Sequence, residues 1–105
     1  MAQFTILYWQ DIPSLVEARA GRKRAKIQLS DRFQELIDSV AMRKGLFGTD
    51  SYLEEWRKGS PEQCDGSPEE VARAVADDLE ARYESIEAEA MAAAIAARKA
   101  ANKSD

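Results

Sequence analysis

Short hydrophobic runs separated by turn-forming residues dominate the start of the chain, a pattern typical of β-strands. Residues 3–9 are rich in β-branched and aromatic side chains and predict the first strand. A turn at residues 11–14 separates it from two further strands, predicted at residues 15–19 and 24–29. Gly21 lies in the hairpin turn between them, where a positive φ is needed. Since both faces of the first strand are partly apolar, we expect this strand to lie at the centre of the sheet or to be covered on both faces.

The pattern takes on a helical period after Ser30, which we expect to be an N-cap. Over residues 31–44 hydrophobic side chains recur every three or four positions, and Gly45 follows as a stop signal. These positions predict an amphipathic helix whose apolar face consists of Phe33, Leu36, Ile37, Val40 and Ala41.

A second, short helix is predicted to begin at Thr49 and to end at Gly59, with Tyr52, Leu53 and Trp56 on one side. We expect both short helices to pack on the sheet. The loop at residues 60–66 contains proline and glycine, and we expect it to hold one short strand at residues 62–64.

The last third of the chain predicts one uninterrupted helix from Ser67 to about Lys103. Ser67 and Glu70 form a capping box, and Pro68 supplies a helical φ at the first helical position. Spacings of three and four then place one apolar stripe on the inner face of this helix. The stripe comprises Val71, Val75, Leu79, Tyr83 and Ile86.

The second half of this predicted helix is alanine-rich, with alanine at nine of the fourteen residues 88–101. Alanine favours a helix but buries little surface, so we expect this half to project beyond its own domain. We therefore divide the chain into one domain, residues 1–87, and an extension of the helix, residues 88–105, whose last residues, Ala101 to Asp105, fray. The predicted fold class is α+β: a small antiparallel sheet of three or four strands, packed by two short helices and one long C-terminal helix.

Charge is distributed unevenly along these 105 residues, although the net charge is only −4. Residues 48–90 hold thirteen acidic residues against four basic ones. Residues 19–26, in contrast, contain no acid and five basic residues, which are Arg19, Arg22, Lys23, Arg24 and Lys26. The sequence thus predicts a polarised molecule with a basic hairpin.

The residue types that support catalysis are largely missing. There is no histidine, and the single Cys64 is flanked by carboxylates that disfavour a thiolate. We therefore expect no catalytic residue, no metal site and no cofactor, and we interpret the chain as a non-enzyme. A single cysteine, with no apolar run long enough for a membrane span and no signal peptide, predicts a cytoplasmic protein.

Docking on a larger protein is the function that these observations favour. The projecting helix would enter a partner's groove, or pair with its own copy, through Ile86, Met91 and Ile95. The basic hairpin would add electrostatic steering through Arg22, Lys23, Arg24 and Lys26. One alternative is that this hairpin contributes to an anionic cofactor site of a partner enzyme. Another is nucleic-acid binding, although the acidic Asp50, Glu54 and Glu55 would repel a phosphate backbone.

Several sequence blocks together resemble the bacterial virulence-factor domain family, the small domain also found in proteins similar to conserved virulence factor C. The likeness covers residues 4 to about 80. It rests on Tyr8-Trp9-x-Asp11-Ile12-Pro13-x-x-Val16, Gly21-Arg22-x-x-x-Lys26, Arg32-Phe33, Ile37-Asp38, Ala41-Met42-x-x-Gly45-Leu46 and Tyr52-Leu53-x-x-Trp56.

This resemblance implies a role in assembly and carries no catalytic residue over to this chain. Members of the family occur within longer proteins that resemble scaffolds, beside an iron–sulfur scaffold-like domain and helical repeats. Stand-alone members are found among genes for folate- and corrinoid-linked one-carbon enzymes. The resemblance therefore makes an enzyme of one-carbon metabolism the expected partner.

Overall fold

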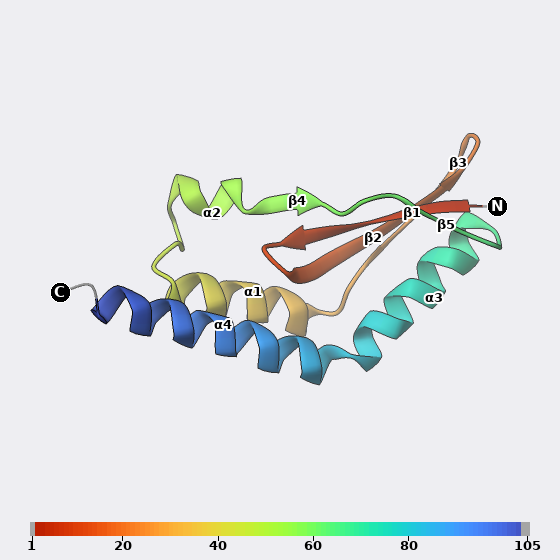
Figure 1. Ribbon diagram of the computed structural model, residues 1–105. Helices are drawn as coiled ribbons and strands as arrows, with labels where there is room; N and C mark the ends of the chain where they lie inside the picture. The colour runs from red at the N-terminus through yellow and green to blue at the C-terminus, as the bar shows by residue number, and fades with distance from the viewer. Residues whose placement is uncertain (1, 104–105) are drawn as a thin grey trace.

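An antiparallel sheet lies on one side of the molecule and three helices lie on the other, in a computed structural model that describes the backbone of residues 2–103 and the side chains of residues 2–96 (Figure 1). The fold is α+β, as predicted. In chain order the elements are β1 (Ala2–Trp9), β2 (Ile12–Ala20), β3 (Lys23–Gln28), α1 (Asp31–Arg43), α2 (Asp50–Glu54), β4 (Trp56–Lys58), β5 (Glu62–Cys64), α3 (Pro68–Ala81) and α4 (Tyr83–Lys103).

The sheet has the strand order β3-β2-β1-β4, and β5 shares the second edge of β1 with β4. Residues 7–9 of β1 pair with β4, whereas residues 2–4 pair with β5. The hairpin between β2 and β3 turns at Gly21, whose φ of +61° confirms the prediction for that position. The predicted turn at residues 11–14 was wrong in extent, because β2 already begins at Ile12, opposite Trp9.

One face of the sheet is covered by α3, which packs against β1, β2 and β3, and by α1, which packs against β2. Alternating strand residues point to this side because successive side chains in a strand face opposite ways. The fully or partly buried members of this layer are Ala2, Phe4, Ile6, Val16, Ala18, Ala25 and Ile27. They meet Phe33, Leu36, Ile37 and Val40 of α1 and Val71, Ala72, Ala76 and Leu79 of α3 in one core.

The second predicted helix is shorter than expected, and this prediction was wrong in its second half. Helix α2 ends at Glu54, and Trp56 belongs to β4, where it pairs with Trp9. Gly59 does not end a helix but lies against the ring of Tyr8, where a Cβ atom would be only 2.9 Å from that ring. Pairing with β1 thus overrides the helical spacing of Tyr52, Leu53 and Trp56.

The prediction of one uninterrupted helix from Ser67 to Lys103 was also wrong. The helix breaks at Arg82, and α4 then turns to lie along α1 and to run in the same direction (Figure 1). Tyr83 explains the turn, because its ring packs edge-on against Phe33 of α1 with centroids 5.0 Å apart. A straight helix would have lost this contact and the burial of Ala94, which has no exposed surface.

The alanine-rich half is therefore anchored further along than we expected. Ile86, Ala90 and Met91 pack against the core, and Ala94 is part of it. The division of the chain at residue 87 stays a prediction, but any overhang starts beyond Ala94. The expected fraying from Ala101 to Asp105 was wrong for its first three residues, because α4 continues through Lys103. Residues 104–105 lie outside the described residues.

A polar clasp holds the joint between α3 and α4 to the start of α1. Ser30 makes no side-chain cap on its own helix, contrary to our prediction, and its hydroxyl donates instead to Glu80 over 2.7 Å. The Ser30 backbone N–H also donates to this carboxylate, and Arg32 donates to it over 3.0 Å. Partial burial acts to raise the pKa of Glu80, but the donors on Ser30 and Arg32 outweigh it and hold this pKa below its ordinary value. Glu80 therefore replaces the predicted cap from a distant helix.

Candidate functional site

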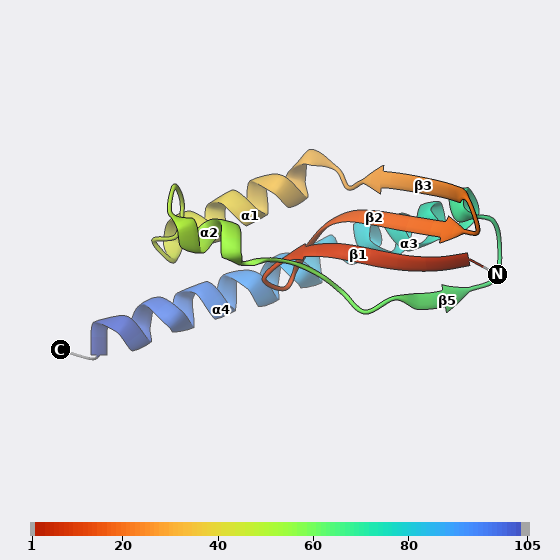
Figure 2. The same cartoon turned by 90° about the horizontal axis from the view of Figure 1, so that it is seen from above.

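In the part of the chain that the structure describes, no helix lies over the centre of the second face of the sheet, and we call this the open face. Figure 2 looks onto it and shows β1, β2, β3 and β5 with α3 behind them. Only α2 covers one end, where the indole N–H of Trp9 donates to the carbonyl oxygen of Tyr52 over 2.8 Å. By strand register, the side chains on the open face are Gln3, Thr5, Leu7, Leu15, Glu17, Arg19, Arg24, Lys26, Gln28, Lys58 and Gln63.

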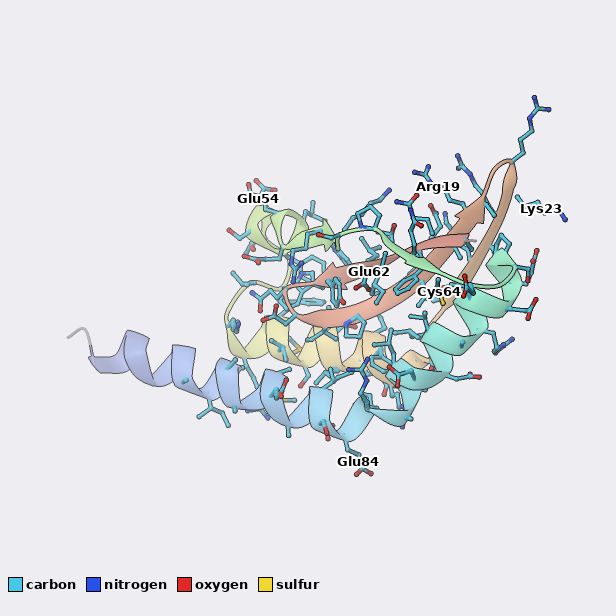
Figure 3. All side chains as sticks on the ribbon, turned by 45° about the vertical axis from the view of Figure 1, so that its right-hand side comes forward. Arg19, Lys23, Glu54, Glu62, Cys64 and Glu84 are labelled. Atoms are coloured by element: carbon cyan, nitrogen blue, oxygen red, sulfur yellow. The ribbon has the colours of Figure 1, made fainter. Side chains whose placement is uncertain are left out.

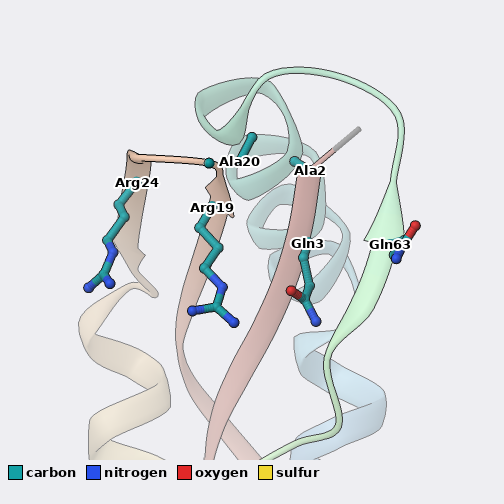
Figure 4. Close-up of a pocket in the computed structure, with 7 residues that line it drawn as sticks. Ala2, Gln3, Arg19, Ala20, Arg24 and Gln63 are labelled. Carbon is teal, nitrogen blue, oxygen red and sulfur yellow. The ribbon is translucent and has the colours of Figure 1, made fainter.

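One row of polar residues crosses four strands of the open face. Arg24 of β3 pairs with Arg19 of β2, Arg19 pairs with Gln3 of β1, and Gln3 pairs with Gln63 of β5. Figure 4 shows Arg24, Arg19 and Gln3 side by side on neighbouring strands, with Gln63 on the next. These four residues, which we call the arginine row, line a hollow of about 270 Å³ together with Ala2, Ala20 and Gly21.

The remaining open face is a mixture of charged and small apolar groups. Lys26 and Glu17 form an ion pair of 3.7 Å in the next row. Leu7 and Leu15 pair across β1 and β2 in the row beyond, beside Lys58 of β4. A shallow hollow of about 210 Å³ lies over these rows, lined by Thr5, Leu7, Leu15, Glu17, Lys26 and Lys58. The face therefore offers a small apolar centre with Lys26 and Lys58 beside it.

Charge separates the two sides of the molecule. The open face holds Arg19, Arg24, Lys26 and Lys58 against the single acid Glu17. The outward side of α3 and α4 is acidic, with Glu69, Glu70, Asp77, Asp78, Glu84, Glu87 and Glu89 exposed. Figure 3 shows Arg19 on the sheet side and Glu84 on the opposite side. The open face is thus locally positive on a chain of net charge −4, and it would attract anionic groups.

The predicted basic cluster is divided by the structure. Arg24 and Lys26 lie on the open face, whereas Lys23 pairs with Ala20 and Arg22 sits in the hairpin turn; all four are exposed. Arg19, Lys58, Gln3 and Gln63 are not among the site residues that the sequence predicts. Arg19 could have been found from the predicted hairpin, because it directly opposes Arg24. The other three depend on pairing across the sheet, which no local signal indicates.

The three predicted residues of the C-terminal helix lie apart from the open face. Ile86 and Met91 are half-buried and pack against the core, whereas Ile95 is 47% exposed. A groove of about 170 Å³ lies beside them, between α1, α4 and the β1–β2 turn. Its rim is polar, and Lys44 donates there to the side chain of Gln10 over 2.7 Å. Partner binding by Ile86, Met91 and Ile95 stays a prediction.

Reactive chemistry has few candidates in this arrangement. Within residues 2–103, no group of three or more cysteine, aspartate or glutamate side chains could hold a metal ion. Burial raises the pKa of Tyr83, and the neighbouring Glu87 carboxylate raises it further, but this hydroxyl belongs to the joint between α3 and α4. Cys64 is half-buried in β5. The feature of the open face that bears on function is therefore its positive charge, not a reactive group.

Fold and surface together define a small α+β domain with one helix-covered and one open, basic sheet face. The chain belongs to the family described as virulence factor, whose family model matches residues 7–92. This match extends into α4 and therefore reaches further than the sequence blocks that suggested the resemblance. The family is not a known catalytic family. No curated protein and no solved structure matches the chain. Across the part of the chain described by the structure, no helix is long and apolar enough to cross a membrane.

Proposed function

We propose that this chain is a non-catalytic docking subunit that binds an acidic surface of a larger cytoplasmic protein on its open face. The observation that carries this proposal is the uncovered sheet face with four cations and one acid, on a molecule that is acidic elsewhere. Leu7 and Leu15 supply apolar contact area at its centre, and the cations around them steer the partner into place. The resemblance to stand-alone family members makes folate- or corrinoid-linked one-carbon enzymes the first partners to test.

The docking surface proposed here is the open face and not the C-terminal helix. Ile86, Met91 and Ala94 are engaged with the core, so α4 has less apolar surface to offer than its sequence suggested. Ile95 and the groove beside α4 can add a second contact, because α4 and the open face lie on different sides of the molecule. A partner that wraps around the domain would use both.

Nucleic-acid binding is less well supported than protein docking. Proteins that bind single strands on a sheet stack bases on exposed aromatic rings. The aromatic rings at the end of the open face that α2 covers pack against one another. The ring centroids of Trp9 and Tyr52 are 5.4 Å apart, and those of Tyr52 and Trp56 are 6.3 Å apart. The arginine row contains no ring on which a base could stack.

The experiment is affinity purification from the native organism, followed by kinetics with the identified partner. We expect the double variant Arg19→Gln, Arg24→Gln to associate about tenfold more slowly at low salt, because steering scales with the local charge. The matched control is Arg43→Gln, Arg73→Gln, which removes two exposed charges from the helix side. Equal association rates for the two double variants would overturn docking on the open face.

A further inference from the structure

The arginine row carries an unusual charge arrangement for a sheet surface. Arg19 and Arg24 are directly opposite on neighbouring strands, and like charges in that position destabilise strand pairing. Among the residues that the structure describes, no acid forms an ion pair with either guanidinium. Glu17 forms its ion pair with Lys26. Glu62 is opposite Phe4 in the strand register, so its side chain faces the helix-covered side. Within the described side chains, the two guanidinium groups of the row are therefore not neutralised by an ion pair.

From this arrangement we propose that the arginine row is a binding site for a phosphate monoester. The proposal rests on the proposed function, since it names the group that the open face would recognise on its ligand. Two guanidinium groups carry two positive charges, and a phosphate monoester carries about −1.5 to −2 at pH 7. A carboxylate carries one negative charge and would leave the row half neutralised.

Hydrogen-bonding capacity leads to the same ligand. Each guanidinium presents its N–H donors in a planar fork that fits two oxygen atoms of an oxyanion. Gln3 and Gln63 add amide donors at the other end of the row. A phosphate monoester has three terminal oxygens that can accept hydrogen bonds from both guanidinium groups and from the amides. A carboxylate has two oxygens, and a single guanidinium can donate to both of them. The hollow of about 270 Å³ has room for a group of several non-hydrogen atoms.

The position of the row explains how a ligand would enter. The hollow lies at the end of the sheet beside the β2–β3 turn, and Arg19 and Arg24 are exposed. In Figure 4 no helix or neighbouring strand crosses in front of Arg19 and Arg24. Arg22 lies in the turn next to this site but does not line the hollow. It is therefore a matched control, because it carries the same charge on the same hairpin.

The test is a titration of the ¹⁵N-labelled full chain with inorganic phosphate, with acetate at equal ionic strength as reference. We expect phosphate to shift the side-chain amide signals of Gln3 and Gln63 and to bind at least about tenfold more tightly than acetate. Arg19→Lys and Arg24→Lys keep the charge but lose the fork, and each should weaken phosphate binding about tenfold. Arg22→Gln should weaken it less than about twofold, as expected for a screened charge outside the row.

Two results would overturn the proposal: equal affinity for phosphate and acetate, or equal weakening by Arg22→Gln and Arg19→Lys. Thermal unfolding of each variant shows whether it is folded, and the two lysine variants serve as independent tests. A phosphoserine peptide then identifies the source of the phosphate: tighter binding than inorganic phosphate indicates a modified partner, and equal binding indicates a small ligand. If phosphate is not recognised but Arg19→Gln, Arg24→Gln still slows docking, only the phosphate site is wrong and the proposed function stands.

Discussion

Leu15 and Val16 are neighbours on β2, yet they lie on opposite faces of the same sheet. Val16 has no exposed surface beneath the helices, whereas Leu15 is only half-buried between Leu7 and Gln28. The same contrast holds across the sheet, because one face is aliphatic and covered and the other is charged and open. Burial supplies the folding free energy on the covered side, so the residues of the open face can be changed with little effect on stability. This division is what a binding surface requires.

The largest effect is expected on the covered side, at Phe33. Its side chain is 1% exposed and packs edge-on against Tyr83. Phe33→Ala should lower the free energy of unfolding by about 3–5 kcal/mol, because it opens a cavity and removes the contact that turns α4 onto α1. Urea denaturation measures this change. Phe47→Ala is the control with the same change of side chain, because Phe47 is 58% exposed. If this variant also lost more than about 1 kcal/mol of unfolding free energy, the contrast between covered and exposed positions would be contradicted.

The neighbours Val16 and Leu15 give the most direct comparison of the two faces. Val16→Ala should cost about 2 kcal/mol, since it removes two buried methyl groups and leaves a small cavity. Leu15→Ala removes more atoms, yet it should cost less than about 1 kcal/mol because Leu15 is still in contact with water. Both variants are measured by urea denaturation with a fixed m-value. Equal losses would show that the open face is covered in solution.

The variant Glu80→Gln tests the polar clasp at the joint and should lower the free energy of unfolding by about 1 kcal/mol. The Glu80 side chain is 27% exposed. Water therefore screens its charged hydrogen bonds, and they stabilise the fold less than buried ones would. Because its pKa is lowered on folding, the clasp stabilises the fold fully above the ordinary pKa of 4.5 and loses this effect as the pH falls through the lowered value. Glu80→Gln should therefore be less stable than the wild type at neutral pH and equal to it in acid. A stability difference that does not change with pH would contradict this assignment.

Local sequence patterns predict the parts of the fold that depend on near neighbours. Gly21 and the alternation around it predicted the β2–β3 hairpin, which brings Arg24 and Arg19 together. The face of α1 was also predicted, since Phe33, Leu36, Ile37, Val40 and Ala41 are all buried. These features depend only on turn chemistry and periodicity.

Features set by distant contacts could not be predicted in this way. Residues 81–83 contain neither glycine nor proline, so helix propensity alone continues through Arg82. The helix break at Arg82 depends on the ring contact between Tyr83 and Phe33 and on the hydrogen bond from Ser30 to Glu80. In both contacts the two partners are far apart in the chain. Lys58 and Gln63 join the open face only through pairing with β1. The sequence therefore predicts the hairpin end of the candidate site but not its other edge, which is formed by Lys58 and Gln63.

The smallest effect on stability is expected at the ion pair of the open face. Lys26 and Glu17 are 3.7 Å apart, with side chains 65% and 33% exposed, so Lys26→Gln and Glu17→Gln should each change the free energy of unfolding by less than about 0.5 kcal/mol. Their effects on docking should nevertheless be opposite, because Lys26→Gln removes a positive charge and Glu17→Gln removes the one negative charge among the described side chains of the open face. An acidic partner should thus associate more slowly with Lys26→Gln and faster with Glu17→Gln, and both differences should shrink at high salt. If both variants lose more than about 1 kcal/mol of stability, the open face contributes to folding as the covered face does. If both associate at the wild-type rate, its charge is not what the partner recognises.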